Sequence, residues 1–217
     1  VLTFTDNFND NTRGAQWDPA YTASYNVDWI TALSSSAVTN ETSSQLQSSI
    51  VNTAAGYGGY VSSGTYNMTG KSMGVEIVQA CKDSNASTDI STTLSVFGAT
   101  YETIRMKIHR EYDDSSISIS TSLESPNCGG NGQWCYNTGV NTFDLVNDRF
   151  IRLRHDPLSD LIYSETSADG VIYYPYASLA RPFSLSTAHF GINAGNQSVG
   201  TGTSTTAIYD NFWTTAP

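Results

Sequence analysis

Residues 104–109 indicate the fold class, and they read Ile104-Arg105-Met106-Lys107-Ile108-His109. Apolar and polar residues alternate there, and successive side chains of a β-strand point to opposite faces. Further segments with strand-like composition are 74–81, 93–97, 117–120, 150–155, 161–165, 171–174, 189–193 and 207–213. Turn-forming residues separate them, and no helical stretch intervenes. This pattern predicts an all-β fold, either a sandwich of antiparallel sheets or a barrel.

The length and composition predict one domain over residues 1–217. No linker divides the chain, and sandwiches of roughly 200–250 residues commonly form a single unit. Hydrophobic residues make up 39% of the sequence, enough to bury a core, whereas charged residues make up only 14%. Such a composition is typical of a secreted β-rich domain rather than a disordered chain.

The net charge of −10 disfavours nucleic acid and anionic membrane surfaces as partners, because it repels phosphate groups. A charge that merely keeps the protein soluble is the plainer interpretation. No run of 18 apolar residues occurs, so we expect no membrane span. We expect an extracellular protein, either secreted or displayed on a surface or virion.

Three cysteines are present. Cys128 and Cys135 bracket a glycine-containing loop whose ends could meet in a hairpin, so we predict a disulfide between them. A zinc site is the alternative, but it lacks a nearby histidine or third cysteine. Cys81 ends a strand-like segment, and we expect it to be a buried free thiol.

The two ends of the chain carry a family resemblance. Residues 4–10 read Phe-Thr-Asp-Asn-Phe-Asn-Asp, and residues 207–213 read Ala-Ile-Tyr-Asp-Asn-Phe-Trp. Before the closing segment come the strand 150–155 and the segment 161–170, which ends in Ser-Ala-Asp-Gly. This order resembles the concanavalin A-like lectin/glucanase superfamily, which includes laminin G-like domains and carbohydrate-binding modules. The resemblance implies a jelly roll, two face-to-face antiparallel sheets with one concave surface.

The same resemblance implies a structural calcium ion where the first and last strands meet. The matching positions are Asp210 on the closing strand and Asp6, Asn9 or Asp10 near the start. Calcium takes six to eight oxygen ligands in flexible geometry, which clustered Asp and Asn side chains can supply. The alternative is that these side chains cap turns and face water.

A carbohydrate ligand would stack on aromatic rings. Candidates are Trp134 and Tyr136 beside the predicted disulfide loop, and Tyr57 and Tyr60 in a glycine-rich segment. For each of them, burial in the core is the competing interpretation. Arg105, Lys107 and His109 share one face of a strand and could bind an acidic polysaccharide, although an ordinary polar strand face explains them too.

Catalysis has less support in the sequence. Retaining glycosidases of the superfamily carry two carboxylates spaced along one strand, and no Glu-x-Asp-x-Glu string occurs here. Related lyases use Tyr, His, Arg and Gln, which makes His109 a candidate base. The leading hypothesis is a non-catalytic carbohydrate-binding or adhesion domain, whose partner is an oligo- or polysaccharide. The alternatives are a structural or receptor-binding element of an extracellular or virion assembly, and a polysaccharide lyase or glycoside hydrolase.

Overall fold

The computed structural model describes residues 4–18, 37–50, 56–81, 90–98, 102–110, 117–124, 134–137, 141–196 and 204–215. Its strands are β1 (Thr5–Asp6), β2 (Trp17–Asp18), β3 (Ala37–Thr42), β4 (Gln45–Ile50), β5 (Gly56–Ser62), β6 (Ser72–Gln79), β7 (Ile90–Phe97), β8 (Thr103–Arg110), β9 (Ser118–Glu124), β10 (Trp134–Asn137), β11 (Asn141–Thr142), β12 (Phe150–Asp156), β13 (Leu161–Ser167), β14 (Tyr174–Ala180), β15 (His189–Asn196) and β16 (Thr205–Thr215). These residues include no helix that is long and apolar enough to cross a membrane.

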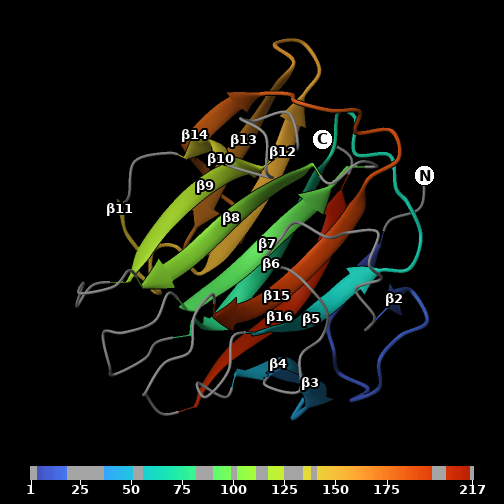
Figure 1. The fold of residues 1–217 in the computed structure, drawn as a ribbon, viewed down its shortest axis with the longest axis vertical. Coiled ribbons are helices and arrows are strands. Elements are labelled where there is room, and N and C mark those ends of the chain that lie inside the picture. The colour runs from blue at the N-terminus through green and yellow to red at the C-terminus, as the bar shows by residue number, and fades with distance from the viewer. Residues whose placement is uncertain are drawn as a thin grey trace.

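The strands form two antiparallel sheets that lie over one another (Figure 1). Sheet I has the order β14-β13-β12-β6-β16-β4-β3, and β1 also pairs with β16. Sheet II has the order β10-β9-β8-β7-β15-β5-β2, and β11 also pairs with β9. The arrangement is an all-β sandwich of two sheets that do not close into a barrel, which is one of the two folds that the alternation predicted and the one that the family resemblance implied.

The alternation within the strands separates core from surface. In β8 the apolar residues Ile104, Met106 and Ile108 are fully buried members of the core. In β12 the buried residues Ile151 and Leu153 join the same core from sheet I. Burial of such a side chain stabilises the folded state by about 1.5–3 kcal/mol.

Polar bonds also connect the two sheets through the core. The hydroxyl of Tyr209 on β16 donates to the backbone oxygen of Asn193 on β15 at 2.6 Å. The hydroxyl of Thr121 on β9 donates to that of Ser164 on β13 at 2.7 Å. Because buried polar groups need partners, these bonds help to fix how one sheet sits on the other.

The two ends of the chain meet in sheet I. Thr5 pairs with Trp213 and Asp6 with Phe212 in antiparallel register. Beside this pairing the Phe4 ring lies 4.6 Å from that of Trp17 and 5.2 Å from that of Phe212, centroid to centroid. The two segments that carry the family resemblance are therefore in physical contact.

One predicted strand is wrong. Residues 171–172 lie in a bend rather than a strand, and β14 starts only at Tyr174. The Asp169 carboxylate accepts the backbone N–H groups of Val171 and Ile172, and Gly170 has a φ of 72°. The turn thereby occupies N–H groups that a strand would use for pairing, and it leaves Val171 80% exposed.

The cysteine predictions have different outcomes. Cys81 is fully buried and free, as expected, and burial raises the pKa of its thiol to about 12. The predicted disulfide involves Cys128, which lies outside the described residues, and Cys135, of which only the backbone in β10 is described. That disulfide stays a prediction.

Candidate functional site

The outer face of sheet II, turned away from the core, carries three polar rows that we call the Lys107 face. The pairing of β15, β7, β8 and β9 aligns the side chains, since directly paired residues share a face. The rows are Gly191-Ser95-Arg105-Ser122, Asn193-Thr93-Lys107-Ser120 and Gly195-Ser91-His109-Ser118. Arg105, Lys107 and His109 therefore share a face, as their spacing in the sequence predicted.

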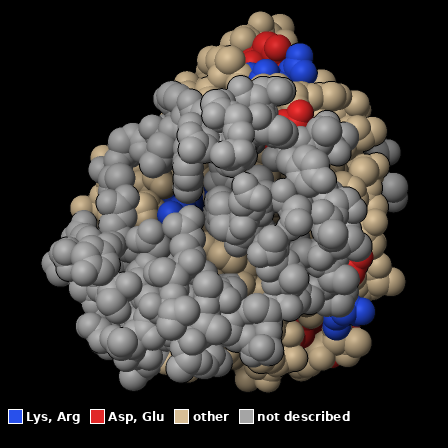
Figure 2. All heavy atoms as spheres, in the orientation of Figure 1, with Lys and Arg blue, Asp and Glu red and all other residues tan. Residues whose placement is uncertain are grey.

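These three side chains are buried, which an ordinary polar strand face would not be. Arg105 is 0% exposed, His109 2% and Lys107 7%. Arginine and lysine are seldom fully buried because removing a charge from water is costly. Figure 2, in the orientation of Figure 1, shows Lys and Arg atoms in blue beside Asp and Glu atoms in red at the top and at the lower right of the molecule. The Lys107 face is thus a buried polar layer rather than a solvated surface.

Asn193 is a central polar residue of this layer. Its amide oxygen accepts the Thr93 hydroxyl at 2.5 Å and the Ser95 hydroxyl at 3.5 Å. Its amide nitrogen is buried and has no hydrogen-bond partner in the described structure. A buried donor without a partner costs about 1–3 kcal/mol, so a ligand that accepts from it would recover that energy.

Two hydroxyls on the same face also lack a hydrogen-bond partner among the described residues. The oxygens of Ser91 and Ser122 are buried, and neither has a partner among the groups that the structure describes. They occupy different rows, on β7 and β9, with β8 between them. Together with the Asn193 amide they give the face spare hydrogen-bonding capacity at several points.

His109 is neutral at physiological pH. Burial, and secondarily the charge of Lys107, lower the pKa of its imidazole to about 4. One ring nitrogen, Nε2, lies 3.1 Å from the Ser120 hydroxyl. The neutral imidazole can accept a proton, but its lowered pKa makes it a weaker base than an ordinary histidine.

The structure separates the predicted stacking residues. Tyr57 pairs with Gly195, which places it on the Lys107 face, where it is 3% exposed. Tyr60 points into the core, with its ring 5.7 Å from that of Trp17 and its hydroxyl beside Glu41. Only the backbone of Trp134 and Tyr136 is described, and it pairs with β9 at the edge of sheet II.

The carboxylates of the predicted calcium site accept hydrogen bonds from protein groups. The Asp6 carboxylate accepts from the Phe8 backbone N–H, the Gln16 amide and the Trp17 indole N–H at 2.8, 3.2 and 2.7 Å. Asp10 accepts the backbone N–H of Thr12, and Asp210 that of Asn211. Nowhere in the described ranges do three or more His, Cys, Asp or Glu side chains form a group fit to hold a metal. Asp6 and Asp10 thus cap local turns, and calcium at the meeting of the two chain ends stays a prediction.

Two acids outside the Lys107 face, Glu165 and Glu76, have basic partners. Glu165 on β13 accepts from Arg152 and Arg154 on β12, with closest N–O distances of 2.6 and 2.9 Å. Glu76 on β6 contacts Arg149 and accepts the Asn211 amide at 2.7 Å. Sequence reasoning missed these pairs because they depend on strand register. Each acid is occupied by protein groups, so neither is a free acid catalyst.

The five central strands of sheet II offer almost no carboxylates. Among the residues of β5, β7, β8, β9 and β15, Glu124 is the sole Asp or Glu, and its side chain lies outside the described part. A glycosidase needs two carboxyl groups about 5–10 Å apart. The described strands of this face do not supply such a pair.

Comparisons with known proteins bear on the fold. No protein-family model matches the chain, and neither does any curated protein. Among solved structures, a prokaryotic β-1,3-1,4-glucanase (lichenase) from a mouse hindgut metagenome matches with a TM-score of 0.68 and 12% identity, over 100% of both chains. The CBM2 module of the evolved Dit protein of Lactobacillus casei BL23 phage J-1 matches with a TM-score of 0.62 and 9% identity, over 97% of this chain and 93% of that one.

A lectin from Bauhinia forficata, solved in complex with GalNAc, matches with a TM-score of 0.53 and 10% identity, over 99% of this chain and 98% of that one. Identities this low show the fold alone. The chain has the concanavalin A-like jelly-roll fold that its two ends predicted.

Proposed function

We propose that this chain binds a carbohydrate on the Lys107 face without cleaving it, and that this face, whose side chains are buried in the structure, opens to admit the ligand. The observation that carries the proposal is the set of buried groups left without partners there: the Asn193 amide nitrogen and the hydroxyls of Ser91 and Ser122. Sugars present many hydroxyls that both donate and accept, so they can satisfy such groups simultaneously. Structural neighbours that are lectins, binding modules and glycanases support a carbohydrate ligand on this fold.

The scarcity of carboxylates on the central strands supports binding over hydrolysis. An alternative ligand class follows from the charges of Arg105 and Lys107, which favour an acidic sugar over a neutral one. A panel that pairs a neutral β-glucan with polygalacturonate separates these two classes.

The decisive variant is Ser91→Ala combined with Ser122→Ala. Neither hydroxyl bonds to the described part of the protein, so their removal leaves the fold intact. Each lost bond to a sugar is worth about 0.5–1.5 kcal/mol, so the double variant should bind about tenfold more weakly in calorimetric titration. Ser49→Ala with Thr206→Ala is the matched control, since those hydroxyls bond to each other at 3.0 Å in sheet I. Equal affinity of the two double variants would contradict the proposal.

The second candidate is a lyase that cleaves acidic polysaccharides by β-elimination, supported by the neutral imidazole of His109. In that reaction a base removes the proton next to the uronate carboxyl group, and the 4-linked sugar oxygen leaves as a double bond forms. An absorbance assay for the unsaturated product separates the candidates. If product forms and His109→Ala abolishes it, the lyase hypothesis would replace the binding hypothesis. If no uronate polymer gives product, the lyase hypothesis would be rejected.

Calcium and the extracellular location remain predictions from the sequence. Thermal melting in millimolar Ca²⁺ and again in chelator tests the metal. A rise in melting temperature that chelator reverses and that Asp210→Asn removes would support the ion. Equal melting temperatures in both solutions would reject it.

A further inference from the structure

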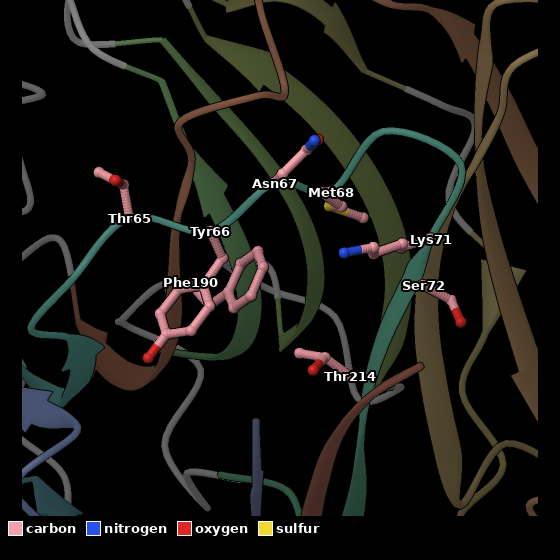
Figure 3. Close-up of a pocket in the computed structure, with 8 residues that line it drawn as sticks. All are labelled: Thr65, Tyr66, Asn67, Met68, Lys71, Ser72, Phe190 and Thr214. Atoms are coloured by element: carbon pink, nitrogen blue, oxygen red, sulfur yellow. The ribbon is translucent and has the colours of Figure 1, made fainter. Parts of the chain in front are cut away.

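A cavity separate from the Lys107 face opens at one end of the sandwich. Its volume is about 170 Å³, and its walls come from the β5–β6 connection, the start of β6, and strands β15 and β16. Figure 3 shows the lining residues, which are Thr65, Tyr66, Asn67, Met68, Lys71, Ser72, Phe190 and Thr214. Exposed Thr65 and Asn67 lie at its mouth, whereas Met68 and Phe190 are buried.

The walls of this cavity are held firmly. Tyr66 and Ala188 exchange backbone hydrogen bonds at 2.8 and 2.9 Å, and the Met68 N–H donates to Leu185 at 2.8 Å. The Tyr66 ring stacks on Phe190 with a centroid distance of 5.2 Å. A cavity whose walls are already ordered loses little entropy when a ligand enters.

Lys71 is the feature that a packing role leaves unexplained. Its side chain is half-buried, and its ammonium is directed into the space between Met68, Phe190 and Thr214 (Figure 3). No ion pair or hydrogen bond of this ammonium occurs in the described structure, whereas Arg149, Arg152, Arg154 and Arg181 all contact carboxylates there. A cation beside apolar walls favours an anion that brings its own apolar surface.

We propose that this cavity binds a small monocarboxylate whose apolar part is about the size of one six-membered ring. A cavity of about 150 Å³ lined by apolar side chains accommodates benzene, so the present volume suits one ring. The carboxylate pairs with the Lys71 ammonium, and the ring packs against Met68 and Phe190. The site goes beyond the carbohydrate proposal and does not depend on it.

Methionine methyl groups give a direct test with benzoate as the probe. The chain has three methionines, of which Met68 lines the cavity while Met73 and Met106 lie elsewhere in the core. In ¹³C-methyl-labelled protein, benzoate should shift the Met68 resonance in a saturable way at millimolar concentration and leave Met106 unmoved. Benzamide, its uncharged analogue, should bind on the order of tenfold more weakly because it lacks the charge.

Two variants of Lys71 complete the test. Lys71→Met should abolish the saturable shift, whereas Lys71→Arg keeps the charge and should retain it. The half-buried position makes both variants compatible with folding, and near-ultraviolet circular dichroism checks this. Absence of a saturable shift, equal binding of benzamide, or unchanged binding by Lys71→Met would overturn the proposal. Lys71→Met should leave polysaccharide binding unchanged, and the Ser91/Ser122 double variant should leave benzoate binding unchanged. The two proposals can therefore be accepted or rejected independently.

Discussion

At the scale of single residues, Glu41 is a buried acid whose ionisation opposes folding. It is 8% exposed on β3, and burial, followed by the charge of Asp6, raises the pKa of its carboxyl group to about 7. Between pH 4.5 and 7 the folded state therefore holds a proton that the unfolded state has released. Its contribution to stability is complete below the unfolded pKa and is lost as the pH rises through 7.

We expect Glu41→Gln to stabilise the protein at pH 8 by up to about 3 kcal/mol, because it removes the buried charge. At pH 4 the gain should be close to zero, since the wild-type carboxyl group is then protonated. Urea unfolding at the two pH values measures the difference. A gain of equal size at both would show that ionisation of Glu41 is not its cause.

Glu165 is a buried acid whose charge, unlike that of Glu41, is compensated by basic partners. It is 3% exposed, yet both of its oxygens accept from arginines, and Arg152 also lies 3.7 Å above the centre of the Tyr173 ring. Breaking a buried pair from one side leaves the other charge uncompensated. Glu165→Gln should therefore cost about 2–4 kcal/mol of unfolding free energy at pH 7, the reverse of Glu41→Gln. A neutral effect in the same urea experiment would show that water solvates the two arginines sufficiently.

At the scale of elements, the contact between β5 and β15 depends on a residue without a side chain. A Cβ placed on Gly59 would overlap the Ile192 carbonyl oxygen and the backbone of Asn193. The close neighbour of this glycine-rich segment is therefore the backbone of another strand. Backbone atoms cannot move aside as a flexible side chain can, so the two strands would have to separate.

Gly59→Ala should therefore destabilise the protein by at least about 2 kcal/mol. Gly64→Ala is the matched control, because a Cβ there meets nothing within 4 Å. Differential scanning calorimetry of both variants measures the effect. Similar melting temperatures for the two would mean that β5 shifts easily against β15.

Strand β14 is an edge of sheet I. It contains Pro175, and its pairing with β13 shifts register between Ser164 and Glu165. Proline and register irregularities both hinder the addition of another strand. A role in an assembly of several chains remains a prediction, and the exposed residues Val171, Ile172 and Tyr174 beside this edge are where a partner should first be sought.

At the scale of the whole molecule, the two sheets are coupled through the bond from Tyr209 to the Asn193 backbone. Tyr209→Phe removes the hydroxyl but keeps the ring, and should cost about 0.5–1.5 kcal/mol of unfolding free energy. Because Asn193 belongs to the Lys107 face, we also expect a weaker affinity for the carbohydrate. Calorimetry of unfolding and of binding on the same variant measures both, and an unchanged affinity would show that the core does not position Asn193.

The sequence by itself determined the class of fold and the orientation of most strands. Alternation is a local property, since adjacent strand residues always face opposite ways, and it placed Arg105, Lys107 and His109 on one face. The exception was the predicted strand 171–174, in which the Asp169 carboxylate accepts hydrogen bonds from the backbone N–H groups of Val171 and Ile172. The motifs at the two ends predicted their pairing, which is a long-range contact that composition alone does not reveal.

Only the tertiary structure decided which side chains are neighbours. The partners of Glu165 and the empty hydrogen-bonding positions of Asn193, Ser91 and Ser122 depend on register and on burial, which are properties of several strands together. Tyr57 and Tyr60 show the difference clearly. They are three positions apart on one strand, so one lies on the Lys107 face and the other in the core. The cavity at Lys71 is likewise invisible in the sequence, since its walls come from segments more than 100 residues apart that only packing of the two sheets brings together.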